Sequence, residues 1–152
     1  MICDKDTVLK KLLHYCSYQD RSLYEVCVKL KSFDLPSNEY DDILKILIDE
    51  GFVDDKRYAE SFVRAKLRYR KWGVNKIRAE LRNKGIDASI IDKALLDVDP
   101  DIYYNTLLSL LQSKKTENPD LFKEKNRLMR FALQRGYQFE MIQCALDDIF
   151  NK

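Results

Sequence analysis

The residues with the clearest chemical character form one basic segment, residues 54–84. Eleven lysine and arginine residues there stand against four acidic ones, so the segment has a net charge of +7. The whole chain carries only +2, so the remaining residues together carry −5. A surface with such an excess of positive charge can bind phosphate groups or carboxylates. A merely solvated helical surface is the alternative, and we favour binding because the imbalance lies in one segment.

The first half of the basic segment predicts an amphipathic helix. Tyr58, Phe62, Ala65 and Tyr69 follow helical spacing and are expected to form its buried face. Trp72 and the glycine after it end this helix. We expect the Trp72 ring to pack between helices rather than to stack on a ligand, because tryptophan is mostly buried.

The second half predicts another helix, which buries Val74, Ile77 and Leu81 and ends at Gly85, where a left-handed cap needs no Cβ atom. Cationic side chains follow separate stripes on both helices. The residues that we expect to bind a partner are Arg57, Arg64, Arg68, Arg70, Lys71, Lys76, Arg78 and Arg82.

No catalytic or metal-binding arrangement is recognisable. His14 is the only histidine, and the run of acids that begins at Asp97 is interrupted by Pro100 and lacks the closing glutamate of a calcium loop. We therefore expect no enzymatic activity, no cofactor and no metal. No secretory signal or membrane-spanning run is visible, which favours a cytoplasmic protein. The cysteines, expected to be reduced and mostly buried, are Cys3, Cys16, Cys27 and Cys144.

The composition favours an all-α protein, because only four glycines and three prolines interrupt 152 residues with 45% hydrophobic content. A capping-box pattern at Ser22 and Glu25 opens one of the helices. Asn118 and Pro119 fit an N-cap followed by proline at the first helical position. Further helices are expected over residues 5–18, 38–50, 101–111 and 139–150, after Asp87, and from Pro119 to Arg135.

The nine expected helices fall into three groups with a period near 51 residues. Shifting the apolar positions of the middle group by 51 residues in either direction gives apolar positions again, as for Val26, Ile77 and Leu128. We interpret the chain as three tandem three-helix repeats, residues 1–53, 54–98 and 99–152. Repeats that contact mainly their neighbours are expected to form an elongated, curved array.

The basic segment resembles the core of the RecX regulatory protein family, the bacterial modulators of the RecA recombinase. The match is an ordered set of short motifs rather than a single one. It comprises Asp54-Asp55, Arg57-Tyr58-Ala59, Phe62-Val63, Lys71-Trp72-Gly73, Lys76-Ile77 and Glu80-Leu81-Arg82-Asn83-Lys84-Gly85-Ile86. The run Arg135-Gly136-Tyr137 and the apolar residues after it are similar to the last repeat of that family.

The resemblance implies a monomeric regulator that binds the RecA–DNA filament and modulates its ATPase, growth and strand exchange, with inhibition as the expected direction. These processes belong to homologous recombination, DNA repair and the SOS response. DNA would be bound weakly or through the filament. Two alternatives stay open: a direct DNA-binding module in which the helices around Trp72 act like a helix-turn-helix, and a passive helical scaffold.

Overall fold

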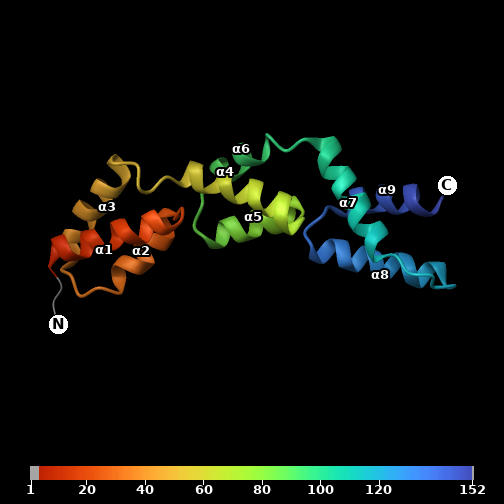
Figure 1. Ribbon diagram of the computed structural model, residues 1–152, viewed down its shortest axis with the longest axis horizontal. Coiled ribbons are helices and arrows are strands. Elements are labelled where there is room, and N and C mark those ends of the chain that lie inside the picture. Colours follow the sequence, from red (N-terminus) through yellow and green to blue (C-terminus); the bar gives the residue numbers. More distant parts are fainter. Residues whose placement is uncertain (1–3, 152) are drawn as a thin grey trace. The chain divides into compact units, whose positions relative to one another are not determined.

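The computed structural model describes residues 4–151, and within this range the chain forms nine α-helices and no strand (Figure 1). The all-α prediction is therefore confirmed. The helices are α1 Lys5–Tyr18, α2 Leu23–Lys31, α3 Tyr40–Asp49, α4 Asp55–Ala65, α5 Val74–Asn83, α6 Ala88–Leu95, α7 Pro100–Lys114, α8 Leu121–Gln134 and α9 Phe139–Phe150. A 3-10 turn, Ser37–Glu39, precedes α3, and a π-helical turn, Lys66–Arg70, follows α4.

Most helix starts lie where local signals predict them, and the start of α8 is one exception. At α2 the Ser22 side chain accepts from the Glu25 N–H while the Glu25 side chain accepts from the Ser22 N–H, so the capping box is confirmed. The predicted cap at Asn118 is wrong, because Asp120 caps α8 by accepting from Lys123 N. Asn118 instead accepts from Asp120 N and shapes the loop before the helix.

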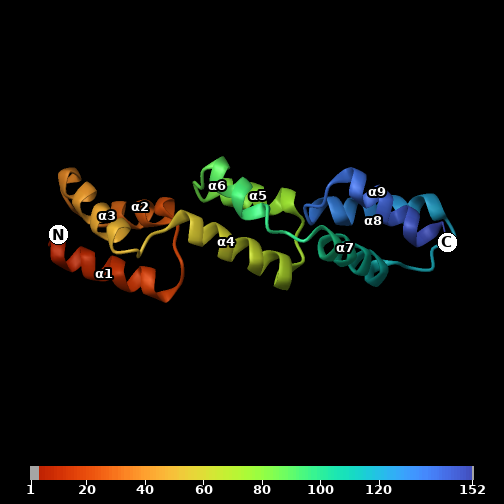
Figure 2. The same cartoon turned by 90° about the horizontal axis from the view of Figure 1, so that it is seen from above.

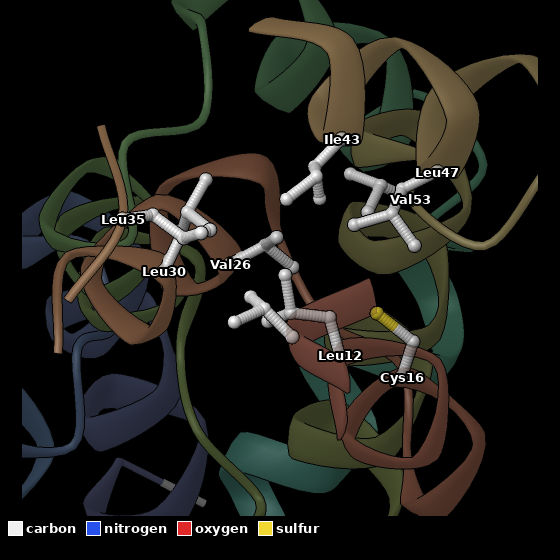
Figure 3. Close-up of a cluster of buried hydrophobic side chains, with 9 residues drawn as sticks. Leu12, Cys16, Val26, Leu30, Leu35, Ile43, Leu47 and Val53 are labelled. Atoms are coloured by element: carbon white, nitrogen blue, oxygen red, sulfur yellow. The ribbon is translucent and has the colours of Figure 1, made fainter. Parts of the chain in front are cut away.

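The chain divides into two compact units. Unit 1 contains residues 4–61 together with Leu81–Ile91, and unit 2 contains Phe62–Glu80 together with residues 92–151. In unit 1, α1 packs against α2 and α3, which also lie beside it in Figures 1 and 2. The side chains that meet in this core include Leu12, Val26, Ile43 and Leu47 (Figure 3).

The core of unit 2 lies between α7, α8 and α9, which contact one another in pairs. Helical spacing with Leu107, Leu108 and Leu111 predicts that Tyr104 of α7 faces the core, but Tyr103 is the tyrosine that is buried. Tyr104 packs at the edge of this core, where its hydroxyl donates to the Asp148 carboxylate. Adjacent residues lie about 100° apart around a helix. The packing of α7 against α9 therefore determines which of the two tyrosines is buried.

The cysteines are less buried as a group than predicted. Cys16 lies in the core of unit 1, Cys27 is half-buried and Cys144 is exposed. Burial raises the pKa of the Cys16 and Cys27 thiols, which keeps them protonated at neutral pH. Cys3 lies outside the described residues.

The 51-residue period is visible in the burial of the side chains. Val26, Ile77 and Leu128, each separated by 51 residues, are all fully buried. Two further sets at the same spacing are also buried, with no side chain more than 8% exposed. They are Leu30, Leu81 and Ala132, and Leu35, Ile86 and Tyr137. This confirms the repeat. The boundaries at residues 53 and 98 and the elongated, curved shape stay predictions.

Each unit contains one junction between consecutive repeats, and the two junctions use equivalent positions. In unit 1 the Ser22 hydroxyl donates to Lys84 O over 3.1 Å, and in unit 2 the Gly73 N–H donates to Arg135 O over 2.7 Å. Gly73 and Arg135 are the positions 51 residues after Ser22 and Lys84. In both junctions the N–H group of the next residue donates to a side chain. Leu23 N donates to the Asp55 carboxylate, and Val74 N donates to the Tyr103 hydroxyl.

Candidate functional site

The first predicted helix of the basic segment is interrupted before its end. Regular α-helix stops at Ala65, and residues Lys66–Arg70 form a π-helical turn. This wider turn changes the angular position of every later side chain, so the predicted buried face is wrong at Tyr69, which is 74% exposed. Tyr58 is buried and Phe62 half-buried, as predicted, because they precede the change.

The end of the π-helical turn, Arg68–Lys71, is held to the last repeat through its backbone, and we call it the fastened turn. Lys71 adopts the left-handed conformation with φ 56°, which is uncommon for a residue with a side chain. The carbonyl of Arg70 accepts from the Arg135 guanidinium over 2.8 Å, and the carbonyl of Lys71 accepts from the Tyr137 hydroxyl over 2.8 Å. Two main-chain carbonyls of this turn are thus held by side chains from the short connection that follows α8.

Two glycines allow the turn and the last repeat to approach at backbone distance. A Cβ atom on Gly73 would lie 2.2 Å from the carbonyl carbon of Gly136. The approach permits the bond from Gly73 N to Arg135 O and a second bond of 2.9 Å from Asn75 N to Gly136 O. Any side chain at Gly73 would force these backbones apart.

Two buried tyrosines complete this attachment. The Tyr103 hydroxyl accepts from Val74 N over 2.9 Å and donates to the Gln138 side chain over 2.8 Å. Its ring lies 5.2 Å from that of Tyr137. Burial raises the pKa of Tyr103 to about 12, and burial likewise raises the pKa of Tyr137. Both hydroxyls therefore remain neutral donors throughout the physiological pH range.

Trp72 packs on Phe62, with a ring-centroid distance of 6.3 Å in an edge-on arrangement, as predicted for a packing residue. Two ammonium groups also contact the Trp72 ring. Lys66 Nζ lies 4.8 Å and Lys76 Nζ 4.4 Å from the ring centroid, within the range of cation–π attraction. The indole thus orients two cations of the basic segment.

The structure distributes the eight predicted binding residues over both units. Arg57 belongs to unit 1 and lies 3.3 Å from the Asp20 carboxylate, and it also donates to Gly51 O. Arg82 is an exposed residue assigned to the same unit. Unit 2 contains the other six, which are Arg64, Arg68, Arg70, Lys71, Lys76 and Arg78.

Within unit 2 these six side chains differ in their surroundings. Arg68, Arg70 and Lys71 are exposed on the fastened turn. Arg64 is exposed on α4. Arg78 is half-buried and pairs with the Asp92 carboxylate, so it is less accessible to a partner than Arg64, Arg68 and Arg70. We therefore place the candidate binding surface on the fastened turn, Arg68–Lys71.

Sequence reasoning did not identify the residues that hold this surface in place. Arg135 and Tyr137 were recognised only as part of a motif, and Tyr104 rather than Tyr103 was expected in the core. The 51-residue offset was the available signal, because it relates Gly73 to the buried Ser22. Among the described residues no cluster of three potential metal ligands exists, and no helix is long and apolar enough to cross a membrane.

Comparison with known proteins identifies the family. The model described as "RecX, second three-helix domain" matches residues 54–95, and that of "RecX, third three-helix domain" matches residues 101–146. The chain belongs to the RecX family. It is 31% identical to the regulatory protein RecX of Clostridium botulinum strain Eklund 17B over 99% of this chain and 74% of that protein. The fastened turn and Arg135–Tyr137 lie one in each matched domain.

Other RecX relatives differ in length and source. The RecX of Limosilactobacillus reuteri strain DSM 20016 is 28% identical over 91% of this chain, which spans only 53% of that protein. The RecX of Legionella pneumophila strain Corby is 28% identical over 90% of this chain and 91% of that protein. The chain is thus close in length to some relatives and about half as long as others.

Solved RecX structures share the fold. The crystal structure of RecX from Lactobacillus salivarius superposes with a TM-score of 0.87 at 26% identity, over 97% of each chain. A second RecX crystal structure gives a TM-score of 0.84 at 27% identity, over 94% of this chain and 71% of that one. The helical repeat architecture is therefore that of the RecX family.

Proposed function

We propose that the protein is a non-enzymatic, monomeric cytoplasmic regulator that binds the RecA–DNA filament and inhibits its ATPase, growth and strand exchange. It would act in homologous recombination, DNA repair and the SOS response. Membership of the RecX family supports a regulatory role. The observation that supports this partner is the fastened turn, where Arg68, Arg70 and Lys71 project from a backbone held by the last repeat.

A filament of recombinase on DNA offers this surface two kinds of anionic group. Arginine forks bind carboxylates of the protein bidentately, and both arginine and lysine neutralise DNA phosphates. The turn needs no catalytic group for this purpose. A protein bound along several protomers would restrain the filament mechanically.

The test is charge reversal on the turn. Arg68→Glu with Arg70→Glu replaces two exposed cations and leaves the main-chain contacts of the turn in place. A charge pair at 4 Å is worth about 1 kcal/mol where water screens it, so a reversal changes the energy by about 2 kcal/mol per position at low salt. We expect about 2–4 kcal/mol for the double variant, which is a shift of roughly 30-fold to 1,000-fold.

The assay is the ATPase of the RecA–single-strand filament titrated with the protein. A matched control, Lys45→Glu with Lys93→Glu, makes the same change in net charge at exposed positions outside the basic segment and should leave inhibition unchanged. Equal inhibition by the double turn variant and the parent would refute the assignment of the turn. Tight, sequence-selective duplex binding without an effect on RecA would favour the helix-turn-helix-like module on α4 and α5.

A further inference from the structure

The first repeat contains a pocket that lies apart in sequence from the basic segment. It has a volume of about 600 Å³ and opens on the surface of unit 1, between residues of α1 and the region of α2. This is a typical size for a ligand site. The described residues that line it, none of them acidic, are Lys10, Lys11, His14, Tyr15, Tyr18, Arg21, Lys29 and Phe33.

The core of unit 1 fixes the side of α1 that lines this pocket. Val8, Leu12 and Cys16 bury one stripe of the helix. Lys10, His14 and Tyr18 follow one another at intervals of four residues on a different stripe. Because the rotation of α1 is set by its buried stripe, the core of unit 1 also fixes the position of Lys10, His14 and Tyr18.

Tyr15 and Phe33 contribute aromatic rings to the pocket, and cationic side chains contact these rings. The Arg21 guanidinium lies 3.8 Å from the centroid of the Tyr15 ring, and its Nε–H donates to Tyr15 O over 3.1 Å. Lys29 Nζ lies 5.5 Å from the Tyr15 ring, and Lys11 Nζ lies 5.5 Å from the Phe33 ring. These contacts place positive charge at the pocket before any ligand arrives.

One ring of the pocket remains available. Tyr18 is 78% exposed, so its ring is accessible to a ligand. An exposed ring beside several cations is the combination by which proteins bind single-stranded nucleic acid, where bases stack on aromatic rings and phosphates contact lysine and arginine. An acidic peptide would use the cations but leave the ring without a role.

The repeat adds an independent observation. Positions 15 and 21 correspond, 51 residues later, to Lys66 and Trp72, which form the cation–π pair beside the fastened turn. The same two positions thus hold an aromatic ring and a cation in both repeats. The ring comes first in the first repeat, as Tyr15, and second in the next repeat, as Trp72. The exposed Tyr18 likewise corresponds to the exposed Tyr69.

We propose that this pocket binds a nucleotide unit of single-stranded DNA, with the phosphate at the lysines and Arg21 and the base on the Tyr18 ring. The site gives the first repeat a role in binding. It uses other residues than the fastened turn, and it can be tested without recombinase, so its failure and that of the filament proposal are distinguishable.

The experiment measures binding of the full chain to a labelled oligothymidine of about eight nucleotides by fluorescence anisotropy, with a duplex of equal length alongside. A site that reads charge alone would favour the duplex, because its charge density is higher. We expect the single strand to bind more tightly at equal salt. We also expect thymidine monophosphate to compete better than inorganic phosphate or oligoglutamate.

The variants separate the ring from the charge. Tyr18→Ala should weaken single-strand binding about tenfold and leave duplex binding unchanged, whereas Tyr18→Phe should retain binding. Lys10→Glu with Lys11→Glu should weaken single-strand binding and reduce its salt dependence. Phe122→Ala, at a ring of similar exposure in unit 2, and the Lys45→Glu/Lys93→Glu variant are the controls.

Some results would overturn the nucleotide site. One is equal affinity for single strand and duplex together with no effect of Tyr18→Ala. Another is oligoglutamate competing as well as thymidine monophosphate, which would assign the pocket to an acidic protein segment. The measurements are repeated in the Arg68→Glu/Arg70→Glu chain, where binding by the fastened turn is removed, and the effect of Tyr18→Ala should persist there.

Discussion

Replacing Gly73 by alanine tests the attachment that holds the candidate surface. The new Cβ atom would lie 2.2 Å from the carbonyl carbon of Gly136 and 2.3 Å from both its oxygen and Tyr137 N. Carbon atoms in contact prefer a separation of about 3.5–4.0 Å, so the two backbones must separate by more than about 1 Å. All three atoms belong to main chain, and no flexible side chain can move aside.

This displacement has two energetic consequences. The hydrogen bonds from Gly73 N to Arg135 O and from Asn75 N to Gly136 O would stretch beyond a bonding distance. Their loss destabilises by about 0.5–1.5 kcal/mol each, and overpacking in a well-packed site adds about 1–3 kcal/mol. We therefore expect Gly73→Ala to lower the free energy of unfolding by about 2–6 kcal/mol.

The measurement is urea unfolding followed by fluorescence of Trp72, which is the single tryptophan of the chain and the neighbour of Gly73. Gly51→Ala is the matched control. Gly51 has φ +77° but nothing within 4 Å of its added Cβ, so only the left-handed backbone penalty of about 1–2 kcal/mol applies. If Gly73→Ala destabilised no more than Gly51→Ala, the close backbone approach would be refuted.

Two further predictions concern buried polar groups of unit 2. Tyr103→Phe leaves Val74 N and Gln138 without their partner and should cost about 1–3 kcal/mol in urea unfolding, whereas Tyr104→Phe at the surface should cost less than about 0.5 kcal/mol. Hydrogen bonds from the Arg127 guanidinium and from Thr116 N lower the pKa of Glu124 from 4.5 to about 2. A carboxyl whose pKa is lower in the folded state stabilises the fold above its unfolded pKa, and this contribution is lost as the pH falls from about 4.5 toward 2. Glu124→Gln should therefore show a weaker loss of stability in urea between about pH 5 and pH 3 than the parent, and an unchanged pH dependence would contradict this role.

Local signals predicted most of the helices. The ends of α1 and α9 follow from apolar periodicity, and the start of α2 follows from Ser22 and Glu25, which interact over three residues. The start of α8 was mispredicted because two capping patterns overlap there. Asn118 with Pro119 matches the usual signature, but the Asp120 carboxylate is the group that accepts from Lys123 N.

The π-turn and the left-handed Lys71 could not be predicted from their own residues. Nothing in the sequence of Lys66–Arg70 disfavours a regular helix. The contact that fixes the turn comes from Arg135, 65 residues away from Arg70. The sequence likewise identified the cations of the basic segment but not their pairing, because Arg57 meets Asp20 and Arg78 meets Asp92 only in the folded chain.

The main-chain carbonyls of the fastened turn are held by the last repeat, whereas its cationic side chains are exposed to a partner. The carbonyl of Arg70 accepts from Arg135 and that of Lys71 accepts from Tyr137, so a partner does not have to order this backbone. Ordering a flexible segment on binding consumes part of the interaction energy, and a preformed turn avoids that loss. Removing the attachment should therefore weaken inhibition of the filament even though no charge changes. Gly73→Ala tests this expectation, because it changes the position of the cations without changing their number.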